Sequence, residues 1–320
     1  MTLIEAEINE RVNNSYEIKN NVLKVVPAPL VSVRTSTYNH GSYIKQCIES
    51  VLMQKTTFPF EYIIGEDCSA DDTRVIVLDY AKRYPDIIRV ITANSNVGSK
   101  ANGRRCIDAC RGKYMAICEG DDYWTDPLKL QKQVDFLEKN KEYVMCFHNA
   151  KILNESASPI HFKKVEEREY LCKELYDEWI VPTASIMIKT DILLKKKIDY
   201  SKLLNGDIFW VMSAFEAGKV YGMADQMSVY RVQPQGVTIR RAMEDNLKLQ
   251  FRYLIHYQYL SDEFKQIPLK SYKRKMADTY INIAVIYFKQ HDLKFIKYLY
   301  MGFKTSSSRF SERFKKLLKR

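Results

Sequence analysis

The sequence of 320 residues lacks any apolar run that approaches the roughly 20 residues needed to cross a bilayer. Its first residues also lack the charged and then apolar pattern of a secretory signal. These two absences exclude an ordinary membrane-spanning or secreted chain. We therefore expect the protein to stay in the cytoplasm.

Cysteine is present but not in a pattern that builds a framework. The seven cysteines are odd in number and include no C-x-x-C, which argues against a set of disulfides or a structural zinc site. No G-x-G-x-x-G follows an apolar strand either, which disfavours a dinucleotide oxidoreductase. The cysteines are most simply interpreted as small core residues.

The net charge of +11 is concentrated at one end of the chain. Residues 245–320 hold 17 Lys or Arg against 6 Asp or Glu, so the excess there equals that of the whole chain. No nucleic-acid recognition motif accompanies this charge, and we expect no nucleic-acid partner.

Strand and helix patterns alternate after the break at Pro27 and Pro29. Short apolar runs predict strands over 30–33, 61–64, 87–92 and 114–118. Between them, amphipathic runs predict helices over 42–53, 71–83 and 100–109. This order predicts a parallel sheet with helices on both faces. In such sheets ligands bind beyond the carboxyl ends of the strands, so we expect the polar clusters around Tyr38, Asp67 and Asp121 to meet at one edge.

Further strands are expected over 143–147, 184–189 and 219–223, with a helix over 208–217. Residues 243–318 are expected to be mostly helical, with breaks at Pro268 and at 306–308 and a helical hairpin over 277–303.

An acidic cluster follows the strand at 114–118 and contains Glu119, Asp121 and Asp122. Three carboxylates this close repel one another, and the local sequence places no Lys or Arg beside them. Carboxylate oxygens suit Mn²⁺ or Mg²⁺, which typically bridges them to substrate phosphates. The alternative on local pattern is a capping cluster for the helix after Asp126 and Pro127.

Four segments in this order resemble the family 2 glycosyltransferases. The segments are Pro29–Val33 with Thr37–Asn39, Glu66–Thr73, Asn96–Gly98 and Glu119–Asp122. The resemblance covers roughly residues 27 to 240. It implies a GT-A fold, a nucleoside diphosphate sugar donor and, in most members, inversion at the anomeric carbon. The stretch Glu119–Glu138 resembles bacterial members that build surface polysaccharides.

The resemblance also implies which residues bind the donor and the metal. Asp121 and Asp122 would bind the ion, and the donor nucleotide would be contacted by Thr37, Tyr38, Asn39, Glu66, Asp67, Asn96, Lys100, Glu119 and Gly120. Two positions depart from the family pattern. Glu119 replaces an Asp that reaches the ribose, and Cys68 replaces a Gly, which suggests a slightly different turn.

The resemblance places the general base at Asp207, which precedes a predicted helix and would take the proton from the acceptor hydroxyl. Its alternative role is the N-cap of that helix. Arg231 could contact the diphosphate from a mobile loop or could pair with a core carboxylate. His148 and Trp179 could line the acceptor site, although packing explains both.

The domain prediction follows from these assignments. We expect an N-terminal extension over 1–26, a GT-A domain over 27–240 with its donor half at about 27–126 and its acceptor half at about 127–240, and a basic helical region over 241–320. The Gly236–Thr238 segment keeps the family's loop pattern. The basic helical region could lie on the anionic inner leaflet near a lipid-linked acceptor, or could be a helical lid with solvated lysines.

Two other functions stay open at this point. A nucleotidyltransferase could use a similar sheet and acidic site, but residues 37–43 lack the Lys or Arg expected for a triphosphate. A catalytically silent nucleotide-sugar-binding or assembly protein could keep the same fold. The sequence and the resemblance together favour metal-dependent transfer of a sugar. The donor would be a UDP-linked sugar, and the acceptor a glycan or a lipid-linked molecule.

Overall fold

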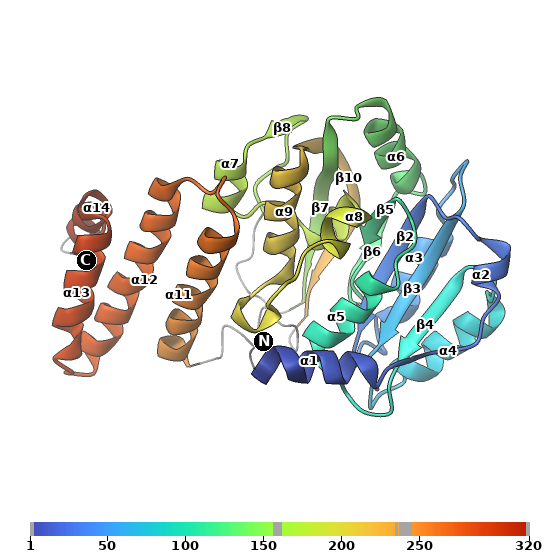
Figure 1. Ribbon diagram of the computed structural model, residues 1–320, viewed down its shortest axis with the longest axis horizontal. Helices are drawn as coiled ribbons and strands as arrows, with labels where there is room; N and C mark the ends of the chain where they lie inside the picture. The colour runs from blue at the N-terminus through green and yellow to red at the C-terminus, as the bar shows by residue number, and fades with distance from the viewer. Residues whose placement is uncertain (1–2, 156–161, 234–235, 237–244, 318–320) are drawn as a thin grey trace. The chain divides into compact units, whose positions relative to one another are not determined.

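The computed structural model describes residues 3–155, 162–233, 236 and 245–317 (Figure 1). The chain forms two compact units. The first comprises residues 1–170, 180–201 and 213–232, and the second comprises 171–179, 202–212 and 233–320. The predicted boundary at residue 240 and most of the Gly236–Thr238 loop lie outside the described residues.

The first unit contains a ten-stranded sheet of order β1-β4-β3-β2-β5-β9-β7-β10-β6, with β8 paired to β10. The strands are β1 (Tyr16–Glu17), β2 (Val31–Thr37), β3 (Phe60–Glu66), β4 (Ile88–Thr92), β5 (Tyr114–Ile117), β6 (Tyr123–Trp124), β7 (Tyr143–Asn154), β8 (Arg168–Tyr170), β9 (Met187–Lys189) and β10 (Lys219–Val232).

Strands β4, β3, β2 and β5 are parallel neighbours, as the sequence predicts. Their burial is nearly complete, which explains why they appear in the sequence as short continuous apolar runs. The rest of the sheet is mixed, since β9 is antiparallel to both β5 and β7, while β7 and β10 are parallel. The predicted α/β class is confirmed.

Three predicted strands differ in extent from those observed. Strands β7 and β10 continue well beyond the runs expected at 143–147 and 219–223, because polar residues interrupt the apolar runs while the backbone pairing of the two strands continues to Asn154 and Val232. The run expected at 184–189 divides into a 3-10 turn at Thr183–Ser185 and strand β9. Strand β1, which the sequence did not reveal, pairs with β4 at the edge of the sheet.

Helices cover both faces of the parallel strands (Figure 1). The helices of the first unit are α1 (Leu3–Asn13), α2 (Val22–Val25), α3 (Ile44–Leu52), α4 (Thr73–Arg83), α5 (Ser99–Asp108), α6 (Lys129–Lys139) and α8 (Thr190–Leu194). Helix α3 shows why they pack there: Ile44, Cys47, Ile48 and Val51 recur at helical spacing, and all four are fully buried. Each buried aliphatic side chain of this kind contributes about 1.5–3 kcal/mol.

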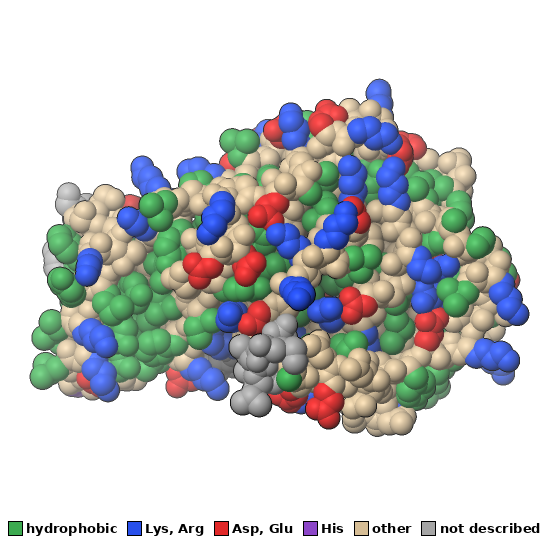
Figure 2. Space-filling model, in the orientation of Figure 1, with side chains coloured by type: hydrophobic (Ala, Val, Ile, Leu, Met, Phe, Trp, Pro, Cys, Tyr) green, Lys and Arg blue, Asp and Glu red, His purple; other side chains and the backbone are tan. Residues whose placement is uncertain are grey.

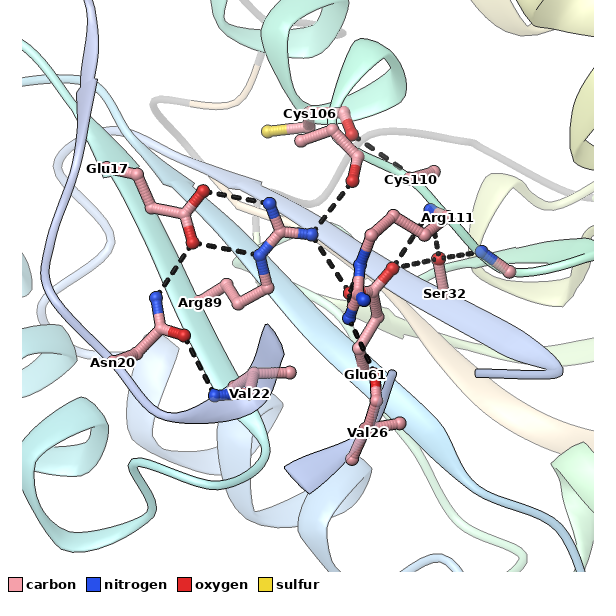
Figure 3. A network of polar contacts seen from close by, with 12 residues as sticks. Glu17, Asn20, Val22, Val26, Ser32, Glu61, Arg89, Cys106, Cys110 and Arg111 are labelled. Carbon is pink, nitrogen blue, oxygen red and sulfur yellow. Dashed lines mark hydrogen bonds and ion pairs between the residues drawn. The ribbon is translucent and has the colours of Figure 1, made fainter. Parts of the chain in front are cut away.

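A polar network joins the amino ends of strands β2, β3 and β4 (Figure 3). The predicted site lies at the opposite, carboxyl ends of these strands. Glu61 on β3 is fully buried and accepts hydrogen bonds from Arg89, Arg111 and Ser32. Arg89 also pairs with Glu17, which ties the edge strand β1 to the sheet. The network satisfies a buried carboxylate with two guanidinium groups, and so fixes the register of the strands at this end.

The second unit is helical, as predicted for the C-terminal region. Its helices are α7 (Cys172–Asp177), the first part of α9 (Gly206–Ala217), α11 (Asn246–Glu263), α12 (Leu269–Lys289), α13 (Lys294–Thr305) and α14 (Ser307–Leu317). A further 3-10 turn, Tyr200–Lys202, spans the boundary in the chain at which the first unit ends and the second begins. Helices α12 and α13 form the expected hairpin, in which the ring of Tyr298 stacks on that of Tyr287 with centroids 5.5 Å apart.

No helix within the described ranges is long and apolar enough to span a bilayer.

Candidate functional site

The loop after β2 is tied to the loop after β3. The backbone N–H of Asn39 donates to Ser69 Oγ at 3.1 Å, and Asn39 Oδ1 accepts from the N–H of Ala70 at 2.9 Å. Asn39 has a left-handed backbone with φ of 54°, a conformation that Asn tolerates better than most residues. Beside it, Tyr38 leaves 38% of its surface exposed. The two loops therefore form one rim, with an exposed aromatic ring on it.

Glu66 and Asp67, at the end of β3, hold backbone segments in place. Glu66 is fully buried and accepts from the N–H groups of Cys68 and Ser69. Asp67 uses one carboxylate oxygen for the N–H of Val97 at 2.7 Å and the other for the N–H of Gly98 at 3.0 Å. Burial raises the pKa of Asp67, although these hydrogen bonds act in the opposite direction. Both acids thus shape the loops that the sequence assigned to nucleotide binding.

Cys68 stands where the family pattern has a glycine. Its φ of 54° lies in the left-handed region, which glycine adopts without penalty and other L-residues adopt at a cost. The turn therefore uses the backbone conformation that glycine favours, although its residue is Cys.

The acidic turn between β5 and β6 packs closely against the end of β2. A Cβ atom on Gly120 would lie 2.6 Å from Thr37 Oγ1 and 2.7 Å from His40 Nδ1. The N–H of Gly120 also donates to the carbonyl of Ser36. Only glycine allows this approach, which brings the acids at 119–122 beside the β2 loop.

The expectation that these acids have no basic neighbour is wrong. Arg34 on β2 is 2% exposed, and its Nη2 lies 3.0 Å from Glu119 Oε1. The two residues are distant in sequence but meet because β2 and β5 are adjacent parallel strands. A single Arg within the apolar run of β2 was the signal available in the sequence.

The remaining two acids of the turn have different surroundings. Asp122 is 3% exposed, and its Oδ1 accepts from the backbone N–H of Arg231 at 2.8 Å. Burial raises the pKa of Asp122 well above its usual range, and the neighbouring charge of Asp121 adds to the rise. The side chain of Asp121 is 21% exposed, and its Oδ2 lies 3.9 Å from His40 Nε2. Of the two predicted metal ligands, Asp121 is therefore the more accessible.

Among the described residues, no group of three or more His, Cys, Asp or Glu side chains has the arrangement of a protein-only metal cage. The donor chemistry at Asp121 still fits Mn²⁺ or Mg²⁺, since these ions take few protein carboxylates and complete their coordination with water and substrate phosphate. Burial is the main cause of the raised pKa of Asp122, and the negative charge of Asp121, which adds to it, is what a cation would offset.

Arg231 lies in strand β10 and not on a loop, and it pairs with a carboxylate. Its Nη1 lies 2.5 Å from Glu155, its Nε donates to the carbonyl of Asp121 at 3.0 Å, and its guanidinium lies over the ring of Tyr43. At 9% exposure it is nearly buried. The sequence allowed contact with the diphosphate or pairing with a core carboxylate; the carboxylate that Arg231 pairs with, Glu155, is exposed.

Three other residues of the first unit that the sequence assigned to donor or acceptor contacts, Asn96, Lys100 and His148, differ in their exposure to solvent. Lys100 donates to the carbonyl of Tyr200 at 2.5 Å, and Asn96 is exposed. His148 is fully buried on β7, where burial lowers its pKa well below the usual range. His148 is therefore enclosed by the sheet in this structure.

Asp207 and Trp179 belong to the second unit. Asp207 is the second residue of α9, one position inside the helix and not at its N-cap, and its Oδ1 accepts from the N–H of Ile208 at 2.9 Å. Trp179, which follows α7, is half-buried.

Residues 32–201 match the family model described as glycosyl transferase family 2. The chain belongs to glycosyl transferase family 2. The matched range includes all three loops that meet at the carboxyl edge of the parallel strands.

The chain is similar in sequence to proteins of Mycobacterium tuberculosis and Bacillus subtilis. The Mycobacterium tuberculosis protein Rv1520, which is uncharacterized, is 34% identical over 213 residues, which cover 65% of this chain and 60% of that protein. The chain thus spans about three fifths of the mycobacterial relatives that it matches. Bacillus subtilis TuaG, which carries the provisional name of a teichuronic acid biosynthesis glycosyltransferase, is 27% identical over 64% of this chain and 79% of its own length.

Solved structures share the fold at low sequence identity. Staphylococcus aureus TarS in complex with UDP aligns with a TM-score of 0.55 at 15% identity, over 89% of this chain and 91% of that one. The Pyrobaculum calidifontis mannosyltransferase PcManGT, in complex with GDP-Man and Mn²⁺, aligns with a TM-score of 0.56 at 13% identity, over 94% and 86%. The shared architecture identifies the fold of this family 2 chain as GT-A.

Proposed function

We propose that this protein transfers a sugar from a nucleoside diphosphate donor, UDP-linked, to a hydroxyl group of a glycan or lipid-linked acceptor in bacterial surface polysaccharide synthesis. The observation that carries the proposal is the contact among three loops, at residues 37–41, 66–69 and 119–122, on one edge of the parallel strands. TuaG, with its provisional teichuronic acid name, supports the choice of a surface polysaccharide.

The donor nucleotide would bind on the rim formed by these loops. Tyr38, Thr37 and Asn39 would line the nucleobase pocket, and Asp67 would contact the base while it holds the loop at 97–98. Glu119 would reach the ribose from its ion pair with Arg34. Gly120 allows the two sides of this pocket to approach, and Glu66, Asn96 and Lys100 would complete its wall.

Asp121 would hold a Mn²⁺ or Mg²⁺ ion, which when bound supplies charge stabilisation for the departing diphosphate. Asp122, the second predicted ligand, is buried and bonded to the backbone of Arg231, so we assign it the role of keeping the turn in shape beside Asp121. TarS with UDP-GlcNAc and PcManGT with GDP-Man and Mn²⁺ are examples of this fold with such ligands.

Asp207 would act as the general base. It would take the proton of the acceptor hydroxyl as that oxygen bonds to the anomeric carbon and the bond from this carbon to the diphosphate oxygen breaks. Attack opposite to the leaving group inverts the configuration at that carbon. A carboxylate in this role contributes a factor of about 10²–10⁴ to the rate.

The test is a panel of nucleotide sugars in which release of the nucleoside diphosphate is followed with Mn²⁺ present. We expect one donor class to be turned over, and Asp207→Asn to lower kcat by about 10²–10⁴-fold with little change in donor affinity. Asp191→Asn is the matched control, since the side chain of Asp191 is 60% exposed in its pair with Lys195. Turnover that survives Asp207→Asn would contradict the assignment of the base, and binding without any turnover would favour a silent nucleotide-sugar-binding protein.

A further inference from the structure

Helix α13 presents a stripe of apolar side chains to solvent. Leu293 at its N-cap, Ile296, Tyr300 and Phe303 are 75%, 57%, 63% and 51% exposed. At 3.6 residues per turn, these four positions fall within about a quarter of the helix circumference. Contiguous exposed apolar surface of this kind marks an interaction site.

The stripe is not the packing face of the helix. The opposite side carries Tyr298, which stacks on Tyr287, and Gly302, which is buried against α12. A Cβ atom on Gly302 would lie 3.2 Å from Ile281 Cγ1, so α12 and α13 approach closely there. Helix α13 therefore has an inner apolar face that packs within the unit and an outer apolar face that is more than half exposed, where Phe303 makes an edge-on contact with the ring of Phe310.

Basic side chains surround the stripe. Residues 288–305 contain four exposed lysines and a single acid, Asp292, which pairs with Lys294 at 3.2 Å. The other three lysines are Lys289, Lys297 and Lys304. Figure 2 shows hydrophobic side chains gathered over the C-terminal helices, with Lys and Arg side chains among them.

We propose that the outer face of α13, which we call the α13 stripe (Leu293, Ile296, Tyr300 and Phe303), docks on an anionic lipid surface. The apolar side chains would enter the boundary between headgroups and acyl chains, and the lysines would meet the anionic headgroups. A second copy of the chain is the weaker occupant, because pairing the same face of two copies would bring like charges together. The positive charge around the stripe therefore favours an anionic lipid surface over a second copy of the chain.

Docking of this kind would bring the enzyme to a lipid-linked acceptor, and this purpose rests on the proposed function. The docking itself depends only on α13 and its lysines. An experiment can therefore contradict membrane docking without contradicting the proposed sugar transfer, and the reverse.

The test is flotation of the full chain with vesicles of phosphatidylcholine mixed with phosphatidylglycerol, and with vesicles of phosphatidylcholine alone, at low and high salt. The stripe variant is Ile296→Ser, Tyr300→Ser, Phe303→Ser. The matched control is Val75→Ser, Ile255→Ser, Leu269→Ser, whose positions are 69%, 52% and 61% exposed and lie outside the stripe. Circular dichroism and light scattering follow folding and oligomeric state, and a thermal shift with nucleoside diphosphate and Mn²⁺ follows donor binding.

We expect the wild type and the control to float with anionic vesicles at low salt, and less so at high salt. The stripe variant should bind at least about tenfold more weakly, because the apolar contribution to interfacial binding is lost. Equal binding by the stripe variant, equal binding to neutral vesicles, or a dimer that only the stripe variant dissociates would overturn the proposal. A wild-type protein that floats with anionic vesicles but shows no thermal shift with nucleoside diphosphate and Mn²⁺ would instead contradict the proposed function.

Discussion

Arg34 and Glu119 form an ion pair across two parallel strands, with 3.0 Å between Arg34 Nη2 and Glu119 Oε1. Arg34 lies within β2, and Glu119 begins the acidic turn after β5. Arg34 Nη1 also donates to Ser36 Oγ at 2.7 Å. The first acid of the turn is therefore positioned by a buried cation of the neighbouring strand.

Removal of this cation should destabilise the protein. Arg34→Met would leave Glu119, whose side chain is only 27% exposed, without its charged partner, and we expect a loss of about 2–4 kcal/mol in the free energy of unfolding. Urea denaturation of Arg34→Met, Glu119→Gln and the double variant measures the coupling. If the two single effects simply add, the pair contributes nothing specific.

A second prediction concerns Lys129, which is fully buried on α6 with its Nζ 3.9 Å from the centroid of the Trp124 ring. Among the described residues, none accepts a hydrogen bond from this amino group. Burial lowers the pKa of Lys129 from its ordinary value to about 7. A neutral lysine in the folded state and a protonated one in the unfolded chain make stability depend on pH.

The sign follows from proton binding. The unfolded chain binds more protons than the folded protein from about pH 7 up to about pH 10.4, so this contribution to stability rises with pH in that window. It amounts to about 2 kcal/mol between about pH 6.5 and pH 8.5. Lys129→Met should remove the rise, as urea denaturation at both pH values would measure. A difference between variant and wild type that is the same at both pH values would show that Lys129 is charged in the folded state.

The left-handed turn at Cys68 gives a third prediction. Cys68→Gly should raise the free energy of unfolding by about 0.5–1 kcal/mol, because glycine relieves the strain of a φ of 54°. Cys68→Ala is the control, since it removes the thiol and its contact with Arg74 but keeps the strain. Equal stability of the Gly and Ala variants, measured by urea denaturation, would show that the turn is not strained.

The sequence predicts the parallel part of the sheet well for a physical reason. Strands β2, β3, β4 and β5 are buried on both faces and so appear as continuous apolar runs, each followed by polar residues at the edge where ligands bind. The outer strands are harder to predict. Strand β1 has two residues and depends on pairing with β4. Strand β10 has polar residues along its length and is defined by its pairing with β7 on one side and with the short strands β6 and β8 on the other.

The residue types of the candidate site were predictable, whereas their partners were not. Asp67 and Asp122 suggest ligand binding in sequence, yet the structure gives their carboxylates to the backbone N–H groups of residues 97, 98 and 231. Such contacts join segments that the fold, and not the local sequence, brings together. The same holds for Arg34, whose partner lies on another strand.

The central claim is that the loops at 37–41, 66–69 and 119–122 form one site for a nucleoside diphosphate and a divalent cation. The direct test is calorimetric titration of UDP and GDP, with and without Mn²⁺, into the wild type, Asp121→Asn and the control Asp79→Asn, whose acid is 59% exposed on α4. We predict Mn²⁺-dependent binding in the wild type and the control, weakened at least about tenfold in Asp121→Asn. Binding that is equally strong without Mn²⁺, or unchanged in Asp121→Asn, would contradict the account.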